Sequence, residues 1–277
     1  MNTRSSFIVH RSSLGVMGIV NVTPDSFSDG GVHFDHAKAV HAALQMEEDG
    51  AVLVDIGGES SRPGAEPVSA EVELERVIPV IEQIRKRSGV PISIDTSKAR
   101  VATEALAAGA DVINDISGMR FDPGMRPLAA RSGAAVILMH MRGEPRTMQK
   151  NIHYDDVVRE VGRELESFRD AAIAAGIDRS RILVDPGIGF GKTFEHNLEL
   201  LASARKLTAI APLVIGASRK AFIGHLTGRD AGPDRAAGSL ATVAAAHRAG
   251  ATLVRVHDVR QTVDFLAVLT AIAEKER

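Results

Sequence analysis

Three residues able to accept hydrogen bonds lie at or near the carboxyl ends of three apolar runs in this chain. Asp95 belongs to PISIDT, Asn114 to DVINDISG and Asp185 to ILVDPG. Buried carboxylates and amides need polar partners. Each alone could cap a helix or fix a loop, but three convergent acceptors suit a ligand edge rich in N–H donors, such as an aminopyrimidinone. These residues therefore predict a site for a flat heterocycle.

Basic residues follow the last two apolar runs and predict an anion site nearby. Arg219 and Lys220 come directly after LVIGAS, and Arg255 and His257 alternate in LVRVHDV. Alternate residues of a strand point to the same face, so Arg255 and His257 present a cation and a possible donor together. An arginine can hold phosphate or lie flat on a heteroaromatic ring. For Arg219, a solvated surface position is an equally good interpretation.

Two segments rich in Gly, Pro, Ser and acidic residues follow the first two apolar runs, TPDSFSDGG at 23–31 and GESSRPGAEP at 58–67. Connections of this length often cover a binding site, although plain surface turns are the alternative. Phe27, in the first segment, would pack on a ligand or anchor the loop to a rim. We interpret both segments as covers over the site.

The segment DPGIGFGKT at 185–193 is similar to a phosphate-binding P-loop, G-x-x-x-x-G-K-[ST], but departs from it at the first position. Pro186 stands where that pattern has glycine, and proline has no N–H and cannot adopt a left-handed conformation. We therefore reject ATP hydrolysis. The glycines would keep side chains away from a flat ligand, with Phe190 as a wall, or would form a flexible turn.

Eight short runs of Val, Ile and Leu must position these residues. They lie at 16–21, 52–58, 91–96, 111–118, 135–141, 182–192, 213–220 and 253–259. An apolar segment with a polar C-terminal tip is typical of a strand that is buried on both faces and delivers its last residue to a site. Eight such segments in sequence predict one pocket built from eight strand ends.

Helical patterns separate the apolar runs. We expect helices at 36–49, 69–87, 98–108, 123–132, 155–175, 195–209, 234–248 and 260–275. Asp35 is a candidate N-cap for the first, and Pro79 would kink the second or mark its start. Gly-Ala pairs stand after helices, where glycine can end a helix in the left-handed conformation. These pairs are at 50–51, 109–110, 133–134 and 250–251.

The alternation predicts an α/β protein, a (β/α)8 TIM barrel that forms one domain over residues 1–277, with 1–14 as an N-terminal extension or hairpin. A doubly wound open sheet is the alternative. Eight units in a chain of this length favour the closed barrel. In a barrel the site lies at the C-terminal ends of the strands, where the polar residues collect.

Composition argues against several classes of protein. A net charge of −2 without a dominant basic stripe argues against a nucleic-acid surface, and the lack of cysteine excludes disulfides and Cys-ligated metals. No apolar run approaches the ~18 residues of a membrane span, and the apolar patch at 7–9 is too short for a secretory signal. We expect a cytoplasmic protein.

Metal ligands are sparse in the sequence. It has no H-E-x-x-H motif and no His-x-His at the end of the first run, which argues against a zinc hydrolase. We expect His140 and His153 to be structural or surface residues. Asn21 and nearby carboxylates could supply oxygen ligands to Mg²⁺, which also binds substrate phosphates and water.

Eight motifs in order resemble the dihydropteroate synthase family of pterin-binding barrels. They are MGIVNVTPDSFSDGG, VDIGGESSRPGA, ISIDT, INDISG, MHMRG, DPGIGFGKT, GASRK and RVHDV, spread over residues 16–259. The first, sixth, seventh and eighth together are highly specific. Ser61 stands where the family usually has Thr. It keeps the hydroxyl and loses a methyl group, so we expect altered packing in that loop rather than lost activity.

The resemblance implies that p-aminobenzoate displaces diphosphate from 6-hydroxymethyl-7,8-dihydropterin diphosphate to give 7,8-dihydropteroate. The catalytic residues that it implies are Lys220, Arg255, Asp95 and Asp185. The substrate-binding residues that it implies are Asp95, Asn114, Asp185, Met139, Phe190, Lys220 and Arg255 around the pterin, Asn21, Arg62 and His257 at the diphosphate, and Phe27, Ser61, Pro63 and Ser218 around the p-aminobenzoate. It also implies a Mg²⁺ ion at Asn21 and a homodimer.

These implied roles favour a dissociative, carbocation-like path without a dedicated strong base. Cations and Mg²⁺ would stabilise the departing diphosphate, and the electron-rich dihydropterin would support the positive carbon. The arylamine is mostly neutral at pH 7 and is a fair nucleophile. The two covering loops would exclude the water that would otherwise trap the cation.

Other functions remain open at this point. A methyltetrahydrofolate–corrinoid methyltransferase shares the barrel and a similar set of pterin-binding acids and amide, but it handles no diphosphate. A barrel aldolase could use Lys220 as a Schiff-base amine, although Lys220 lies past the apolar run rather than within it. A non-catalytic pterin carrier is the third alternative.

Overall fold

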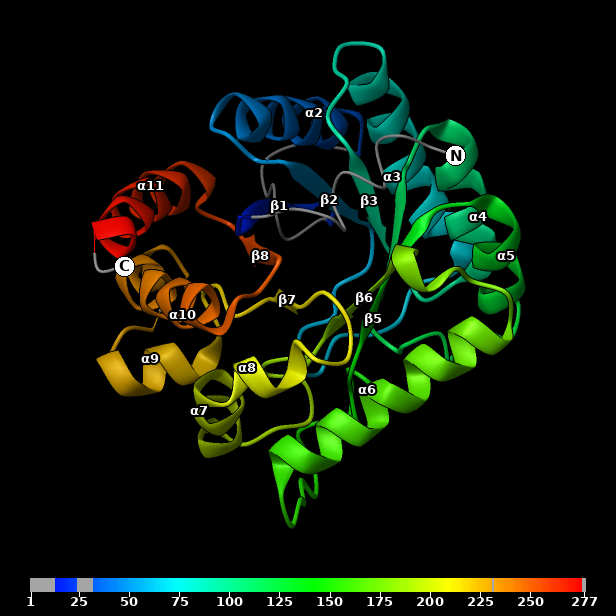
Figure 1. The fold of residues 1–277 in the computed structure, drawn as a ribbon. Helices are drawn as coiled ribbons and strands as arrows, with labels where there is room; N and C mark the ends of the chain where they lie inside the picture. Colours follow the sequence, from blue (N-terminus) through cyan, green and yellow to red (C-terminus); the bar gives the residue numbers. More distant parts are fainter. Residues whose placement is uncertain (1–12, 24–31, 231, 276–277) are drawn as a thin grey trace.

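Eight parallel strands close into a ring at the centre of the molecule (Figure 1). The computed structural model describes residues 13–23, 32–230 and 232–275. The strands are β1 (Gly15–Asn21), β2 (Leu53–Gly57), β3 (Ile92–Asp95), β4 (Val112–Asp115), β5 (Ala135–Met139), β6 (Ile182–Asp185), β7 (Val214–Ile215) and β8 (Leu253–Val256). They pair in the order β6-β5-β4-β3-β2-β1-β8-β7, and a parallel bridge between Val184 and Leu213 joins the two ends. The predicted barrel is confirmed, and the open sheet is wrong.

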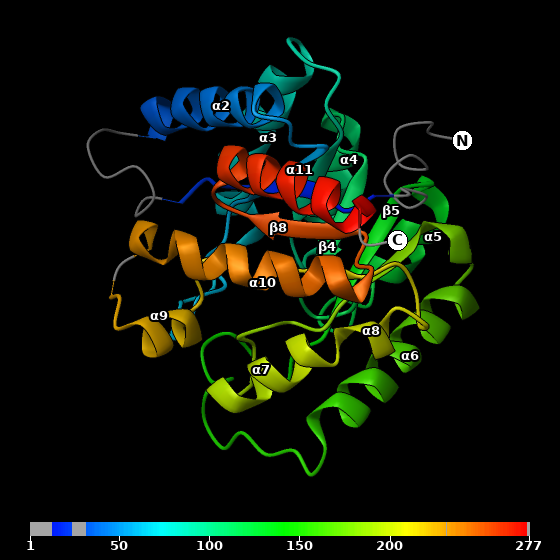
Figure 2. The same ribbon diagram turned by 60° about the vertical axis from the view of Figure 1, so that its left-hand side comes forward.

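Helices surround this ring on its outside, as the two views in Figures 1 and 2 show. They are α2 (Val32–Glu48), α3 (Ala70–Arg85), α4 (Ala99–Ala108), α5 (Met125–Ser132), α6 (Val157–Ala174), α7 (Phe194–Ala202), α8 (Ala204–Leu207), α9 (Ala221–Thr227), α10 (Ala236–Ala249) and α11 (Val259–Lys275). In the part of the chain that the structure describes, none of them is long and apolar enough to cross a membrane.

The inside of the barrel changes from apolar to polar toward the carboxyl ends of the strands. An apolar cluster fills its lower part: Met17, Leu53, Val112, Ala135, Ile137, Leu183, Val214 and Leu253. Residues two positions further along a strand point to the same side. On four of these strands that next inward position is polar: Asp55, Asn114, Asp185 and Arg255. The packed base therefore supports a polar layer directly above it.

Glycine ends the helices where the Gly-Ala pairs predicted it. Gly109, Gly133 and Gly250 are left-handed C-caps, with φ of +114°, +74° and +76°. Pro79 lies inside α3, and Ser69 caps the start of that helix by accepting the backbone N–H of Val72. Pro79 therefore does not mark the helix start.

Three expectations about the helices need correction. The helix α2 begins at Val32, so Asp35 lies within it and is not its N-cap. The pattern at 195–209 divides at Ser203 into α7 and α8. The helix α9 was not predicted, because seven residues are too few to show an amphipathic stripe. Of the expected N-terminal hairpin at 1–14, residues 1–12 lie outside the described residues.

The turn after β6 requires a glycine. Gly187 has φ of +65°, and a Cβ there would lie 1.9 Å from the carbonyl oxygen of His140. We expect Gly187→Ala to lower the free energy of unfolding by clearly more than the ~1–2 kcal/mol of a left-handed alanine, because the backbone of His140 must move. Gly133→Ala is the matched control, with a similar φ and no atom within 4 Å of the added carbon. Equal losses in urea unfolding would contradict this prediction.

Candidate active site

A cavity of about 1140 Å³ opens at the carboxyl ends of the barrel strands. Its lining includes most of the predicted site residues: Asn21, Ser61, Arg62, Pro63, Asp95, Phe190, Ser218, Lys220, Arg255 and His257. Three further predicted residues, Met139, Asn114 and Asp185, are almost fully buried in β5, β4 and β6. Phe27 lies outside the described residues. The strand ends thus bring together residues that are far apart in the sequence.

Arg255 lies between two carboxylates on the floor of this cavity. Its Nε–H donates to Asp55 Oδ2 at 2.6 Å, and its Nη2 donates to Asp95 Oδ2 at 2.8 Å. Asn114 Nδ2 donates to the same Asp55 oxygen at 3.2 Å. Burial disfavours the charge of Arg255, but Asp55 and Asp95 outweigh it and raise its pKa. The ends of β2, β3, β4 and β8 are thereby joined in one polar network.

Both predicted carboxylates of the floor hold their protons more tightly than usual. Burial raises the pKa of Asp95 to about 7, against the opposing charge of Arg255 and with help from the carboxylate of Asp55. Burial also raises the pKa of Asp185, although the backbone N–H of Gly187 donates to its Oδ1 at 2.7 Å. Acids with perturbed pKa values in a cleft are typical of functional sites. These two groups can accept hydrogen bonds from a ligand or, when protonated, donate one.

Lys220 and Phe190 form a wall beside these acids. Lys220 is the N-cap residue of α9, and its Nζ lies 4.1 Å from the centre of the Phe190 ring. Burial lowers the pKa of Lys220 to about 8, and the charge of Arg255 acts in the same direction. Behind Phe190 lie three methionines in one apolar cluster: Met139, Met141 and Met148. A flat ring could lie against this apolar wall with its edge toward the acids.

His257 and Ser218 are hydrogen-bonded at the end of β8. Ser218 Oγ accepts the backbone N–H of His257 at 3.3 Å and lies 3.1 Å from its Nδ1. Burial lowers the pKa of His257 to about 4, with Arg219 and Arg255 acting in the same direction, so the ring is neutral at pH 7. With the Ser218 proton directed at Nδ1, the Nε2–H remains free to donate to a ligand. His257 can therefore serve as a neutral donor.

Arg219 is a paired residue of the cavity wall rather than a solvated surface residue. Its Nε–H donates to Asp258 Oδ2 at 3.0 Å, and its backbone, with φ of +59°, donates to Ser239 Oγ at 2.9 Å. Arg235 Nη1 in turn donates to the Arg219 carbonyl at 3.1 Å. These contacts fix the segment that carries Ser218 and Lys220.

Ion pairs around Lys98, one of them with the buried Glu73, anchor the loop after β2. Lys98 Nζ donates to Glu73 Oε2 at 2.6 Å and also pairs with Glu59 at the start of the loop. Further along, Ser61 is half-buried and Arg62 is exposed, and both line the cavity. The loop therefore has a fixed base, and Arg62 is available to an anion.

Sequence reasoning missed two charged residues of this region. Asp55 interrupts the apolar run VLVDIGG, and a lone charge inside a buried strand was the signal available for it. Lys192, the lysine of the P-loop-like segment, is 2% exposed, and its Nζ donates to the Phe190 carbonyl at 2.9 Å. This lysine turns beneath its own loop, which agrees with the rejection of a P-loop.

The glycines of the same loop were expected to keep side chains away from a flat ligand. The structure gives a different reason for glycine at two of these positions. A Cβ on Gly191 would lie 2.7 Å from the Arg142 carbonyl oxygen. A Cβ on Gly187 would likewise clash with the backbone of His140. Both positions let two backbone segments approach closely. Of the three left-handed glycines in this loop, Gly189 is the one beside Lys220, with 3.1 Å between an added Cβ and Lys220 Cδ.

Metal ligands remain sparse in the folded chain. Among the residues that the structure describes, no group of three or more His, Cys, Asp or Glu residues could hold a metal ion. His140 is buried with Nε2 3.1 Å from Glu164, and His153 is exposed, as expected. Asn21 ends β1 and lines the cavity. A single amide oxygen fits only a cation that takes its remaining ligands from substrate and water, as Mg²⁺ does.

Comparisons with known proteins agree with this geometry. Residues 17–257 match the family described as pterin binding enzyme. The chain is 48% identical to dihydropteroate synthase from Escherichia coli (strain K12), over 92% of this chain and 90% of that protein. The chain belongs to the dihydropteroate synthase family.

Solved structures of the dihydropteroate synthase family share the fold. The enzyme from Xanthomonas albilineans with 4-aminobenzoic acid has a TM-score of 0.90 and 49% identity, covering 95% of this chain and 94% of that one. The same enzyme in complex with 7,8-dihydropteroate has a TM-score of 0.86 and 47% identity at the same coverage. The resemblance predicted from the motifs is confirmed.

The raised pKa of Asp95 predicts a pH-dependent stability. An acid whose pKa is raised in the folded state stabilises the fold below its unfolded pKa, and this contribution is lost as the pH rises through about 7. We expect the free energy of unfolding of Asp95→Asn, relative to the unchanged protein, to increase from pH 5 to pH 7.5 and then to level off. Urea unfolding at several pH values measures this difference, and a difference independent of pH would contradict it.

Proposed function

We propose that this chain synthesises 7,8-dihydropteroate from 6-hydroxymethyl-7,8-dihydropterin diphosphate and p-aminobenzoate, as a step of folate biosynthesis. The observation that carries the proposal is the cavity itself, where an acidic and amide floor lies next to a cationic wall. In support, the related Xanthomonas albilineans enzyme is known in complex with 4-aminobenzoic acid and with 7,8-dihydropteroate.

The pterin would bind at the floor of the barrel. Its N–H edge would meet the carboxylates of Asp95 and Asp185 and the amide of Asn114, and its carbonyl would accept from Lys220. Phe190 and Met139 would supply the apolar wall behind the ring. Arg255, held flat by Asp55 and Asp95, would stack on the ring and support phosphate with its remaining N–H groups.

The diphosphate would lie beside Arg62 and His257, which line the cavity and can donate hydrogen bonds. The reaction breaks the bond between the pterin methylene carbon and the diphosphate oxygen, and the electron pair leaves with the diphosphate. Donors preorganised around the leaving oxygens stabilise the charge that develops on them. The neutral ring of His257 can donate from Nε2 without first taking up a proton.

Mg²⁺ would be held by Asn21 together with the diphosphate and water. It would supply positive charge to the leaving group. The side-chain amide oxygen of Asn21, at the end of β1, would point toward that group.

The p-aminobenzoate would occupy the outer part of the cavity, between Ser61, Pro63, Ser218 and Lys220. Its amine attacks the methylene carbon, a new C–N bond forms, and the nitrogen then releases one proton. This nucleophile needs no strong base, because its lone pair is already available at pH 7. The loop after β2, anchored through Glu59 and Lys98, would help to keep water from the cationic carbon.

The alternative functions fit the site less well. A corrinoid methyltransferase has no use for the donors of Arg62 and His257 at the mouth. A Schiff-base aldolase could use Lys220 as its amine, but it has no use for a floor of acceptors that matches the N–H edge of a pterin. A pterin carrier would bind the same head group without turnover.

The decisive experiment measures diphosphate release from the dihydropterin diphosphate, with and without p-aminobenzoate and with a chelator. We expect release that depends on p-aminobenzoate, yields 7,8-dihydropteroate and falls when Mg²⁺ is removed. Binding without release would indicate a carrier. Cobalamin-dependent methyl transfer, or borohydride trapping of a keto substrate on Lys220, would favour the other two alternatives.

Replacing Asp185 tests the pterin site directly. We expect Asp185→Asn to weaken binding of the pterin diphosphate by about 10- to 100-fold, because a charged acceptor on the buried floor is lost. Calorimetry measures the dissociation constant. Asp170→Asn, an exposed position on α6, is the control and should leave it unchanged. Unchanged affinity in Asp185→Asn would contradict the role given to this residue.

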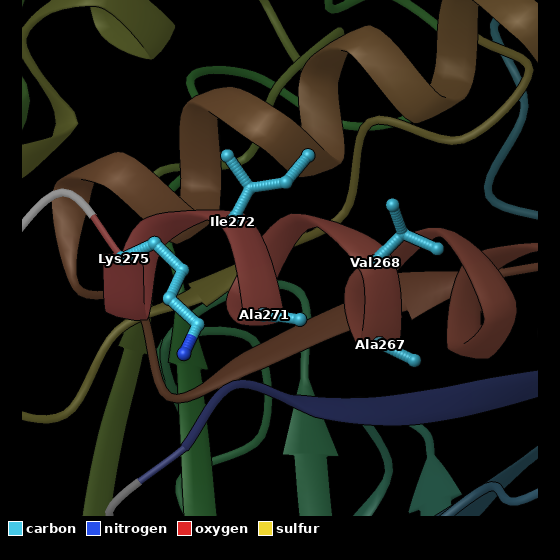
Figure 3. A pocket seen from close by; sticks show the side chains of 5 residues that line it. All are labelled: Ala267, Val268, Ala271, Ile272 and Lys275. Atoms are coloured by element: carbon cyan, nitrogen blue, oxygen red, sulfur yellow. The ribbon is translucent and has the colours of Figure 1, made fainter.

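We also propose that the chain is cytoplasmic and acts as a homodimer through α11. Apolar side chains project from this helix without cover in the described part of the chain, with Val268 62% and Ile272 53% exposed. Figure 3 shows them along α11 with Ala267, Ala271 and Lys275, which line the same hollow of about 630 Å³. A second copy would remove this surface from water.

Charge on this face should separate the copies. We expect Val268→Glu with Ile272→Glu to shift the chain from dimer to monomer in analytical ultracentrifugation, because two carboxylates would be buried without partners. Val72→Glu, at an exposed apolar position on α3, is the control and should remain dimeric. A dimer unaffected by the double change would place the interface elsewhere.

A further inference from the structure

A buried lysine of the cavity lining, Lys192, has no role in the steps above. Lys192 Nζ donates to the Phe190 carbonyl at 2.9 Å, lies 3.0 Å from His140 Nδ1 and lies 3.4 Å from the His140 carbonyl. Three acceptors around one nitrogen match an ammonium group, which has three N–H donors and no lone pair. The geometry therefore fits the charged form of Lys192.

His140 lies between Lys192 and Glu164 of α6 and contacts both. Because Nδ1 accepts from Lys192, its proton lies on Nε2, which donates to Glu164 Oε2 at 3.1 Å. Burial lowers the pKa of His140 to about 4, and the charge of Lys192 acts in the same direction, so the ring stays neutral. Glu164 in turn accepts from Arg142 Nε at 3.0 Å. The chain Lys192–His140–Glu164 thus ends on a surface ion pair.

The loop after β6 is tied down at three carbonyls by three different donors. Gln149 Nε2 donates to the Gly189 carbonyl at 2.8 Å, and the Tyr154 hydroxyl donates to that of Gly191 at 3.1 Å. Lys192 holds the carbonyl between them, at Phe190. Only this third tie carries charge.

The charge of Lys192 also acts on the floor of the cavity. The charged groups that face Asp185 include Lys220 from α9, Arg255 from β8 and Lys192 from the loop. Those that face Lys192 include Asp185, Glu164, Lys220 and Arg142. A positive charge at Lys192 favours the ionised form of Asp185. Burial lowers the pKa of Lys192 to about 7, so this charge is present below that pH.

We propose that Lys192 is a positioning residue of the pterin site, which fixes the Phe190 wall through its carbonyl and favours the ionised form of Asp185 through a buried positive charge. A lysine that only filled space would be replaceable by methionine, which is apolar and of similar length. The proposal instead requires two separable properties, a donor under Phe190 and a charge behind Asp185. It rests on the proposed function only for the choice of pterin as the ligand.

The test measures binding of 6-hydroxymethylpterin by calorimetry between pH 5 and pH 8. Lys192→Met removes donor and charge, whereas Lys192→Gln is neutral but keeps a donor. Affinity should fall on the acidic side of the pH profile, which we call the acid limb, as Asp185 takes up a proton. We expect both variants to move this limb to higher pH, because Asp185 then protonates more easily. We expect Lys192→Met also to weaken binding about tenfold at pH 7.5, and Lys192→Gln to weaken it less.

Tyr154→Phe is the matched control, because it removes a neutral tie at the adjacent carbonyl. Its acid limb should stay where it is in the unchanged protein, while a loosened loop weakens binding equally at all pH values. An acid limb that stays in place in both Lys192 variants, with circular dichroism and melting confirming their fold, would overturn the proposal. So would an equal shift in Tyr154→Phe.

Turnover separates this inference from the proposed reaction. If the unchanged protein binds the pterin but releases no diphosphate, the proposed reaction fails and the binding test of Lys192 still applies. If turnover occurs, the KM for the pterin substrate in Lys192→Met should rise more than the KM for p-aminobenzoate. An equal rise in both would indicate a general disturbance and contradict the proposed role.

Discussion

The site depends on one mostly buried cation, Arg255, which is shared by two carboxylates and is 20% exposed. Taking an ion out of water costs several kcal/mol, and only close, well-directed partners offset this cost. The planar guanidinium of Arg255 meets Asp55 and Asp95 with separate N–H groups and so ties β8 to β2 and β3. Burial raises the pKa of Asp95 to about 7, and the negative charge of Asp55, which Arg255 alone cannot neutralise together with that of Asp95, acts in the same direction. A ligand edge with several N–H donors would relieve this excess negative charge, which is why the floor suits a pterin.

The cavity brings hydrogen-bond acceptors and donors together, and the proposed chemistry uses both. The acids lie on strand ends beside Arg255 and Lys220, whereas Arg62 and His257 line the cavity from a loop and from just past β8. In the proposed reaction the pterin carbon becomes positive while the diphosphate becomes more negative. On a dissociative path the acids would stabilise the first charge, whereas Arg255, Arg62 and the Nε2–H of His257 would stabilise the second. Uniform charge throughout the cavity would bind the substrate but would not favour the transition state over it.

The sequence predicted the barrel and most of the lining because both depend on local order. Each apolar run predicts a strand from its own residues. In the barrel, polar residues such as Asp95 and Asp185 lie together because they stand at the carboxyl ends of these strands. What it missed depends on distant contacts. Nothing local to Asp55 shows that Arg255, 200 residues further on, provides its counter-charge. The short helix α9 lacks a periodic stripe, yet it sets the place of Lys220 at its N-cap.

The P-loop-like segment shows how one sequence pattern can serve two different physical needs. In a P-loop, glycines let backbone N–H groups surround a phosphate, and the lysine reaches the same phosphate. Here Gly187 and Gly191 let the loop approach the backbone of His140 and Arg142, and the lysine turns inward to a carbonyl of its own loop. Close backbone packing and phosphate binding both demand glycine, so the spacing alone does not distinguish them. The lysine does, because an ammonium group surrounded by three protein acceptors has no donor left for an anion.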